Sequence, residues 1–251
     1  MLLNELTDYL NALLNVSAFD DYAPNGLQVE GRPEVRRLIG GVTASQALID
    51  VAIDRQADAL LVHHGYFWKG EDPRIVGIKR LRLQSLLGAG ISLLAYHLPL
   101  DAHPEFGNNV QLALQLDINV EGHFTGGHGV DLALYGHLQQ PMSAAALRQH
   151  ISDSLQRQAL HLSGYDQPIR RVAWCTGAAQ SYFQAAVDLG VDAFISGEVS
   201  EPCTHLARES GVHYFAAGHH ATERFGVQAL GRHLAAEYNL DFEFVDVENP
   251  V

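Results

Sequence analysis

The chain has little cysteine, few cationic side chains and no long apolar run. Its two cysteines, Cys175 and Cys203, form no CxxC pair, so we interpret both as buried small hydrophobic residues and expect a reducing, cytoplasmic setting. The 16 Lys and Arg residues are outnumbered by 29 Asp and Glu residues, which gives a formal net charge of -13. Because nonspecific nucleic-acid binding depends on cations that neutralise phosphates, no nucleic-acid partner is expected.

The apolar runs are too short for a membrane segment. The longest, at residues 59–62 and 91–96, fall far below the ~20 residues that span a bilayer. The amino-terminal residues carry acidic side chains and repeat apolar positions at helical spacing, which predicts a first helix. With 251 residues, 47% of them hydrophobic, the chain can bury a core without disulfides. Because its apolar runs are short, we expect no membrane partner.

Short apolar runs alternate with amphipathic helical stretches along the whole chain. Such runs suit buried parallel strands, and the alternation predicts an α/β fold. Small or capping residues follow two of the runs, at residues 43–46 and 176–180, where helices are expected to begin. The predicted strands are residues 38–42, 59–62, 91–96, 172–175, 193–195 and 212–217.

An internal repeat relates the two halves of the sequence at a constant offset of 134 residues. It predicts two related α/β lobes, residues 1–124 and residues 125–251, with an inserted segment at about 125–170 in the second. The identities that carry the repeat are Arg37, Ala44, Gln46, Ala52, Asp54, Asp58 and Ala59, which recur as Arg171, Ala178, Gln180, Ala186, Asp188, Asp192 and Ala193.

Histidine and carboxylate residues follow the predicted strands in both halves. The repeat aligns His64 with Glu198, and a small gap aligns His97 and Asp101 with His219 and Glu223. The carboxyl ends of strands in open α/β sheets are where ligands bind, so these side chains are expected to share a cleft between the lobes. The candidates are His63, His64, His97, Asp101, Glu198, His219 and Glu223.

Imidazoles and carboxylates that converge in this way suit a metal site, although each motif has an ordinary alternative. A lone His at a strand end is more often a surface group, and an i, i+4 pair such as His219 and Glu223 is also a common helix contact. Adjacent His63 and His64 can face one cluster only if they sit in a turn, which Gly65 permits. Nitrogen and oxygen ligands without thiolate suit Zn, Mn, Fe or Ni.

Six motifs together carry a family resemblance: DYAPNGLQVEG at 21–31, GVTAS at 41–45, DALLVHHGYFWKG at 58–70, HLPLDAHPEFGNN at 97–109, FISGEVSE at 194–201 and AAGHHATERFG at 216–226. Through them the chain resembles the dinuclear-metal-centre family of GTP cyclohydrolase 1 type 2 homologues, in particular its compact YbgI-type bacterial members, over nearly its full length. The resemblance implies two divalent metal ions per subunit, ring-shaped homohexamers, and the ligands His63, His64, Asp101, His219 and Glu223, with His97 and Glu198 close by.

The resemblance implies a metal-dependent hydrolase acting on a small-molecule substrate, a nucleotide or a related heterocycle. His97 and Glu198 are then the candidate catalytic residues for proton transfer. Trp68, Lys69 and neighbouring aromatic residues are candidates for contacting the substrate. Two alternatives stay open: a noncatalytic metal-binding scaffold or regulatory ring, and nucleotide binding at helix N-termini, for which the sequence has no P-loop or GxGxxG pattern.

Overall fold

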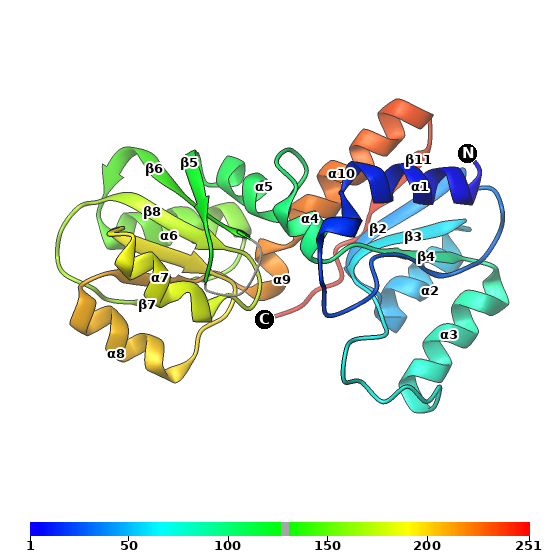
Figure 1. Ribbon diagram of the computed structural model, residues 1–251, viewed down its shortest axis with the longest axis horizontal. Helices are drawn as coiled ribbons and strands as arrows, with labels where there is room; N and C mark the ends of the chain where they lie inside the picture. The colour runs from blue at the N-terminus through cyan, green and yellow to red at the C-terminus, as the bar shows by residue number, and fades with distance from the viewer. Residues whose placement is uncertain (127–130) are drawn as a thin grey trace. The chain divides into compact units, whose positions relative to one another are not determined.

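The chain folds into two compact units, each with a sheet covered by helices on both faces (Figure 1). The computed structural model describes residues 1–126 and 131–251. The first unit comprises Met1–Phe106 and Gly226–Glu248, and the second comprises Gly107–Phe225 and Asn249–Val251. The predicted α/β class and the paired lobes are therefore confirmed.

The sheet of the first unit has the strand order β1-β4-β3-β2-β11. Strand β1 is antiparallel to β4, and the remaining neighbours are parallel. The strands are β1 (Gly26–Val29), β2 (Arg37–Thr43), β3 (Ala59–His64), β4 (Ser92–Ala95) and β11 (Asp241–Phe244).

Alternating side chains of the first sheet pack against different helices. Leu60 and Val62 of β3 belong to the core beneath α2 and α3, whereas Ala59 and Leu61 belong to the core beneath α1 and α10. Both faces of the central strands are consequently buried from solvent, which explains their unbroken apolar sequence. The helices are α1 (Leu3–Leu13), α2 (Gln46–Asp54), α3 (Gly77–Ala89), the short α4 (Leu98–Ala102) and α10 (Arg224–Tyr238), with a 3-10 turn at Val16–Ala18.

The sheet of the second unit has the order β5-β6-β8-β9-β10-β7. Strands β8, β9 and β10 are parallel, while β7, β6 and β5 join antiparallel to their neighbours. The strands are β5 (Ile118–Phe124), β6 (Ala133–Met142), β7 (Leu160–Leu162), β8 (Ile169–Cys175), β9 (Ala193–Ser196) and β10 (His213–Ala216).

Helices α5 and α6 cover one core of the second unit, and α7 and α8 cover the other. Trp174 lies fully buried in the first of these cores, whereas Cys175 and Cys203 are buried in the second. Both cysteines thus behave as the predicted small core residues. The helices are α5 (Asn108–Gln115), α6 (Ala144–Leu155), α7 (Phe183–Asp188), α8 (Glu201–Ser210) and α9 (His219–Thr222), with a 3-10 turn at Gln180–Tyr182 before α7.

The predicted strand-helix-strand repeat is confirmed by the register of its strands. Leu38 pairs with Ala59 in the first unit, and the residues 134 positions later, Val172 and Ala193, pair in the second. The crossover helix of the first unit begins at Gln46, and the 3-10 turn that opens the second begins at the equivalent Gln180. Sequence and pairing register therefore repeat together.

One aspartate anchors each repeat. Asp58 Oδ2 accepts hydrogen bonds from the backbone N–H groups of Arg36 and Arg37, at 2.9 and 3.0 Å. Asp192 Oδ2 accepts the same two bonds, both at 2.8 Å, from Arg170 and Arg171. Each carboxylate ties the start of one parallel strand to the loop before the next, which fixes the register of the pair.

The unit boundaries differ from the predicted division at residue 124. Helix α5 and strand β5 lie in the amino-terminal repeat but belong to the second unit, whereas α10 and β11 return to the first. Each repeat thus donates its last helix and strand to the other unit, which a sequence repeat alone does not reveal. The predicted inserted segment, about 125–170, contains β6, α6 and β7, and its residues 127–130 lie outside the described part of the chain.

Helix α3 exposes several apolar side chains. Ile78, Leu81 and Leu87 are 68%, 50% and 61% exposed.

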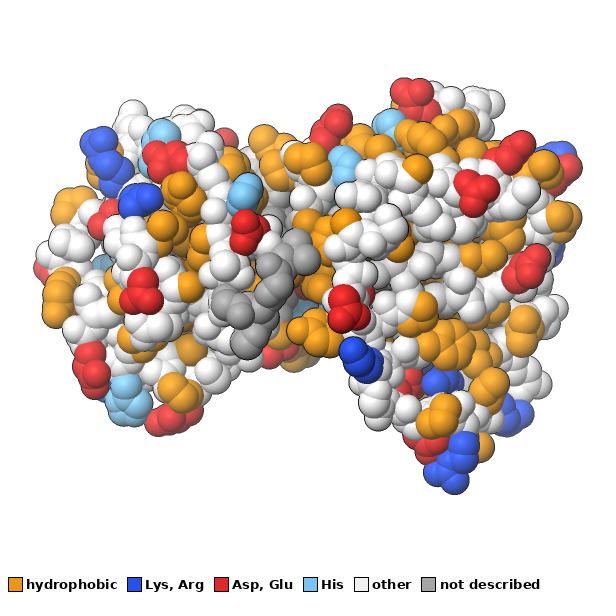
Figure 2. Space-filling model, viewed as in Figure 1, with side chains coloured by type: hydrophobic (Ala, Val, Ile, Leu, Met, Phe, Trp, Pro, Cys, Tyr) orange, Lys and Arg blue, Asp and Glu red, His pale blue; other side chains and the backbone are white. Residues whose placement is uncertain are grey.

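Figure 2 shows Asp and Glu side chains scattered over the face in view, with Lys and Arg side chains concentrated around α3. Within the described residues, no helix is long and apolar enough to cross a membrane.

We predict that Asp58→Asn and Asp192→Asn each lower the free energy of unfolding by about 1–2 kcal/mol, because each weakens two hydrogen bonds to backbone N–H groups. Burial raises the pKa of Asp58, but the bonds from Arg37, Arg36 and Arg32 outweigh it and hold that pKa below its ordinary value. The ionised Asp58 carboxylate therefore adds to the free energy of unfolding above about pH 4, and this contribution is lost as the pH falls.

Urea denaturation of both variants beside the wild type checks this prediction. Asp54→Asn, at an exposed position on α2, is the control and should change stability by less than about 0.5 kcal/mol. If Asp58→Asn and Asp192→Asn behave like that control, the anchoring role is wrong.

Candidate metal centre

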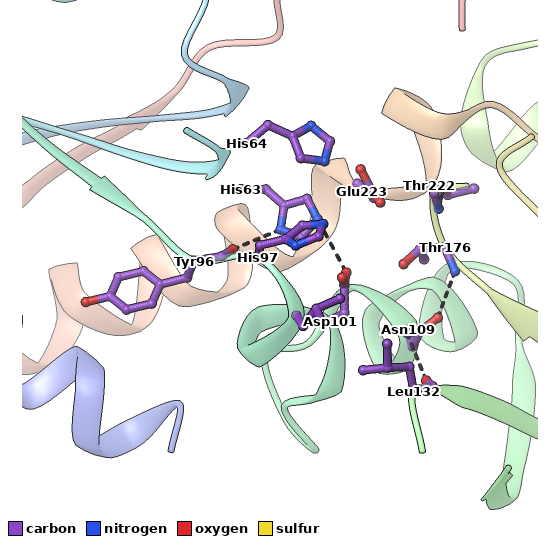
Figure 3. A network of polar contacts seen from close by, with 12 residues as sticks. His63, His64, Tyr96, His97, Asp101, Asn109, Leu132, Thr176, Thr222 and Glu223 are labelled. Atoms are coloured by element: carbon purple, nitrogen blue, oxygen red, sulfur yellow. Dashed lines mark hydrogen bonds and ion pairs between the residues drawn. The ribbon is translucent and has the colours of Figure 1, made fainter. Parts of the chain in front are cut away.

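His63 is a fully buried imidazole near the end of β3. Its Nδ1 lies 2.9 Å from the backbone oxygen of Tyr96, which can only accept, so Nδ1 carries the proton and donates. Its Nε2 lies 3.5 Å from Asp101 Oδ1 (Figure 3). The backbone carbonyl thus fixes the tautomer and leaves Nε2 directed toward a carboxylate, as in metal-binding histidines.

His64 is the last residue of β3 and is not in a turn, contrary to the expectation for this pair. Thr43, its partner across the strands, places Oγ1 3.2 Å from His64 Nδ1. The ring centroids of His63 and His64 are nevertheless only 4.5 Å apart. His64 stays in the ladder, and its backbone oxygen accepts a hydrogen bond from the N–H of Ala44 at 2.9 Å, so the two rings approach each other at a paired strand end.

His97 occupies the position before α4 and is held by a residue that the sequence interpretation missed. Its Nδ1 lies 2.7 Å from Asp21 Oδ1, while Asp21 Oδ2 accepts hydrogen bonds from Asn25 and from the backbone N–H of Leu98. Burial raises the pKa of Asp21, but the contacts with His97 and Asn25 outweigh it and lower the pKa overall. Asp21 is therefore an ionised anchor for the imidazole.

The imidazoles of the first unit form a candidate metal cluster. One nitrogen from each of His63, His64 and His97 lies within 4.8 Å of the others. Asp101, buried within α4, contributes the neighbouring carboxylate through its contact with His63. Imidazole nitrogens and a carboxylate without thiolate form a donor set that divalent transition metals accept.

The second unit places its own imidazole between two carboxylates. His219 Nδ1 lies 2.7 Å from Glu198 Oε1, and His219 Nε2 lies 3.1 Å from Glu223 Oε2. Glu198 follows β9, whereas His219 is the first residue of α9 and Glu223 directly follows that helix. His219 and Glu223, the i, i+4 pair predicted from the sequence, thus make a direct contact. Glu198 contacts the other nitrogen of the same imidazole ring.

A glycine turn makes room for Glu223. Gly177 has a φ of +67°, and a Cβ built there would collide with Glu223 Oε1, so any side chain would displace the carboxylate. Asn109 holds the turn: its Oδ1 accepts from the backbone N–H of Thr176 at 2.9 Å, and its Nδ2 donates to Leu132 at 3.1 Å (Figure 3). The predicted capping sequence at 176–180 therefore supports the carboxylate.

The repeated His and carboxylate spacing does not correspond to one repeated contact. The N–H of Asp101 bonds to the oxygen of His97, whereas the N–H of Thr222, not Glu223, bonds to the oxygen of Gly218. The backbone hydrogen bonds therefore differ between the two aligned positions. Accordingly, Asp101 contacts His63, while Glu223 contacts His219.

The charge state of His219 follows from its two carboxylate neighbours. Burial alone would lower the pKa of the imidazole, but Glu223 and then Glu198 raise the pKa of His219 to about 9 through hydrogen bonds and charge attraction. In metal-free protein at neutral pH the ring is therefore an imidazolium. A metal ion that takes either nitrogen must displace a proton, which couples metal affinity to pH.

Comparison with known proteins identifies the class to which this fold and these donor groups belong. The model of the Duf34/NIF3 (NGG1p interacting factor 3) family matches residues 1–250. The chain belongs to this family, and the predicted resemblance is confirmed. A relative from Pseudomonas aeruginosa, named GTP cyclohydrolase 1 type 2 homolog, is 55% identical over 99% of this chain and 98% of its own.

Solved structures agree with this assignment. The protein ybgI, described as of unknown function, has a TM-score of 0.96 and 50% identity, with both chains covered completely. A protein from Thermus thermophilus has a TM-score of 0.88 and 35% identity, again with complete coverage of both chains. Full-length similarity extends the family assignment to both units.

The raised pKa of His219 predicts a pH-dependent stability for metal-free protein. A folded-state pKa of about 9 against about 6.5 unfolded stabilises the protein fully below pH 6.5, and this contribution is lost as the pH rises to 9. The loss should amount to at most about 3.4 kcal/mol. Urea denaturation in chelator at pH 6 and pH 9.5 measures it.

His219→Gln should abolish this part of the pH dependence. His205→Gln is the matched control, because His205 also contacts a carboxylate, Glu201 at 3.1 Å, but on the exposed surface of α8. An unchanged pH dependence in His219→Gln would show that the imidazolium between Glu198 and Glu223 does not contribute.

Proposed function

We propose that this protein binds two divalent metal ions through His63, His64, Asp101, His219 and Glu223, and that it is a metal-dependent hydrolase acting on a nucleotide or a related heterocycle. The observation that carries the proposal is that both units present buried or half-buried imidazoles and carboxylates at the carboxyl ends of their parallel strands, with the Nδ1 atoms of His63 and His219 already engaged. The name shared by curated relatives supports the substrate class.

The donor atoms fit Zn, Mn, Fe or Ni. Imidazole and carboxylate groups are acceptable to all four ions, and the protein's two thiols, Cys175 and Cys203, are packed in the core of the second unit. Glu223 would hold a cation through its carboxylate oxygens. The shared cleft predicted from the sequence stays part of this proposal.

Two cations, when bound, would polarise the bond under attack and lower the pKa of a water molecule. His97 and Glu198 are the groups proposed for proton transfer, and each is already in a carboxylate–imidazole pair. For a GTP-like substrate the proposed reaction adds water at C8 of the purine, opens the ring, and releases formate by hydrolysis.

An aromatic side chain beside the imidazoles supports a flat substrate. Trp68 is half-buried, with its ring centroid 5.0 Å from that of His97 and 6.0 Å from that of His64. Tyr66 instead serves the core, since its hydroxyl donates to the oxygen of Ala44 at 2.7 Å. Trp68 is therefore proposed to contact a heterocycle.

We further propose that the protein works as a cytoplasmic homohexamer. The family resemblance supports the ring, and the exposed apolar side chains of α3, including Ile78 and Leu81, supply a surface that association would cover. Light scattering of purified protein measures the mass of the assembly.

Glu223→Gln should lower the metal content from about two ions per chain and abolish formate release from GTP, while leaving the fold and the assembly intact. Glutamine keeps the size of the side chain but removes the anionic oxygen. The two units bury large cores of their own, so the metal is not needed to fold them. Elemental analysis, a formate assay with each metal, and thermal midpoints measure these effects.

Glu201→Gln is the matched control, because it neutralises a glutamate in an exposed i, i+4 contact with a histidine. It should retain both ions and full activity. Loss of folding or assembly in Glu223→Gln would make the metals structural and favour the noncatalytic scaffold. Unchanged metal content would remove Glu223 from the ligands.

A further inference from the structure

Helix α6 and the chain that returns beside it line an open cavity in the second unit. The helix buries Leu147, Ile151 and Leu155 in the core, while its outer face and residues 156–161 surround a volume of about 960 Å³. That volume falls at the upper end of the roughly 300–1,000 Å³ of small-molecule sites. The lining of this α6 cavity is largely polar and includes Arg148, Gln149, Ser152, Arg157, Gln158 and His161.

Hydrogen bonds hold the returning chain against α6. Gln156 ends the helix with a φ of +55°, and the N–H of Arg157 donates to the carbonyl of Ser152 at 3.0 Å. The hydroxyl of Ser152 accepts from the N–H of Ala159 at 3.1 Å. Arg148 completes the link, because its Nε donates to the Ala159 carbonyl at 2.9 Å. The guanidinium of Arg148 is therefore tethered at the cavity.

Arg157 is held in place by the backbone of two other segments. Its Nη2 donates to the carbonyl of Pro250 at 2.7 Å. Its guanidinium also lies against Gly218, where φ is +100° and a Cβ built there would collide with Arg157 Nη1. Glycine is required at this position both for that φ and for the space. Because Gly218 directly precedes His219, Arg157 lies next to the turn that carries a proposed metal ligand.

A second cavity adjoins the first at Arg157. It has a volume of about 400 Å³, and its lining shares Arg157 and Gln158 with the α6 cavity. Glu198 also lines it, and Glu198 Oε1 lies 2.7 Å from His219 Nδ1. A ligand that occupies both cavities would therefore pass Arg157 and approach Glu198, the residue proposed for proton transfer.

The two arginines keep their positive charge. Among the residues that the structure describes, no carboxylate forms an ion pair with Arg148 or Arg157, and each donates to a carbonyl through one nitrogen, which leaves other N–H groups for a ligand. Asp153 also lines the cavity, but it is exposed and accepts from Gln149 Nε2 at 2.8 Å. In a chain with a formal net charge of -13, these guanidiniums supply the local positive charge that an anionic ligand needs.

His161 forms a neutral, fixed wall of the same cavity. His213 Nε2 lies 2.9 Å from the carbonyl oxygen of Tyr165, so that nitrogen donates and His213 Nδ1 accepts. His161 Nε2 therefore donates to His213 Nδ1 at 3.0 Å, and its ring stacks on Phe215 with 4.6 Å between centroids. Burial, followed by His213 and Arg148, lowers the pKa of His161, so the ring is uncharged at neutral pH. The guanidiniums are consequently the cations of the cavity.

We infer that Arg148 and Arg157 form a subsite for the phosphate groups of an anionic small molecule, with the α6 cavity as its binding space. Guanidinium groups suit phosphate because they present several N–H donors in one plane and stay charged. The inference deepens the proposed function, on which it rests for a nucleotide as the ligand. The phosphate chain of a nucleoside triphosphate binds at the two arginines, and the rest of the molecule extends through the second cavity toward Glu198.

The test measures binding to the metal-free full chain, so that its result does not depend on catalysis. Isothermal titration calorimetry in chelator follows three probes, which are GTP, tripolyphosphate and guanosine. Arg148→Gln and Arg157→Gln each remove one guanidinium. Arg170→Gln is the matched control, because Arg170 is an exposed arginine of β8 that lines neither cavity. Thermal midpoints show whether each variant is folded, and Arg148→Lys or Arg157→Lys replaces a glutamine variant that is not.

GTP and tripolyphosphate should bind and compete with each other, whereas guanosine, which has no phosphate, should not displace tripolyphosphate. Arg148→Gln and Arg157→Gln should each weaken the binding of both phosphorylated probes by at least about 10-fold, because hydrogen bonds to a charged group are lost. The lysine variants keep the charge but not the planar donors, so they should weaken binding less. Asp153→Asn should strengthen binding by up to about 5-fold, since it removes a like charge at an exposed position. Arg170→Gln should leave the affinities unchanged.

The outcomes separate this inference from the proposed function. If tripolyphosphate does not bind the wild type, or binds Arg148→Gln and Arg157→Gln as tightly as the wild type, the inference is wrong. Equal weakening by Arg170→Gln would also overturn it, because the effect would then follow net charge and not the cavity. If binding depends on both arginines but the metal-loaded wild type releases no formate from GTP, the phosphate subsite stands and the proposed reaction fails.

Discussion

The candidate site depends on the parallel register of two strand pairs, β2 with β3 and β8 with β9. Leu38 lies opposite Ala59 and Val172 lies opposite Ala193. The two strand pairs therefore have the same register, and in each pair the residues at the carboxyl ends of the strands lie side by side. A slip of one residue would turn His63 from its buried position toward the opposite face of the sheet. Asp58 and Asp192 oppose such a slip, because each accepts two backbone N–H groups across the loop between the strands.

With the strand ends fixed, the cost of burying polar groups determines how the side chains are arranged. A buried imidazole such as His63 is tolerable because its Nδ1 proton has an acceptor in the Tyr96 carbonyl. The buried carboxyl of Asp21 is tolerable for the same reason, since N–H groups and His97 satisfy its oxygens. The contacts that satisfy burial also select tautomers and ring orientations, so stability and ligand geometry arise from the same hydrogen bonds.

The sequence predicted the features that depend on local pattern and missed those that depend on distant partners. The strands, the register of the repeat, and the contact between His219 and Glu223 follow from periodicity and spacing. The role of Asp21 does not, because its partner His97 lies 76 positions away and the intervening chain has no period that joins them. The exchange of α5 for α10 between units was also missed, since a repeat specifies similar elements but not the sheet on which each one packs.

Divergence between the repeats explains why the two units offer different chemistry on one scaffold. At the end of the second parallel strand the first unit has His64 and the second has Glu198, 134 positions later. The first unit thereby has an imidazole where the second unit has a carboxylate. The second unit gains carboxylates that hold His219 as an imidazolium, with a pKa of about 9, until a cation replaces its proton. Metal binding to His219 at neutral pH should therefore release a proton, so the metal affinity of the second unit's donors depends on pH.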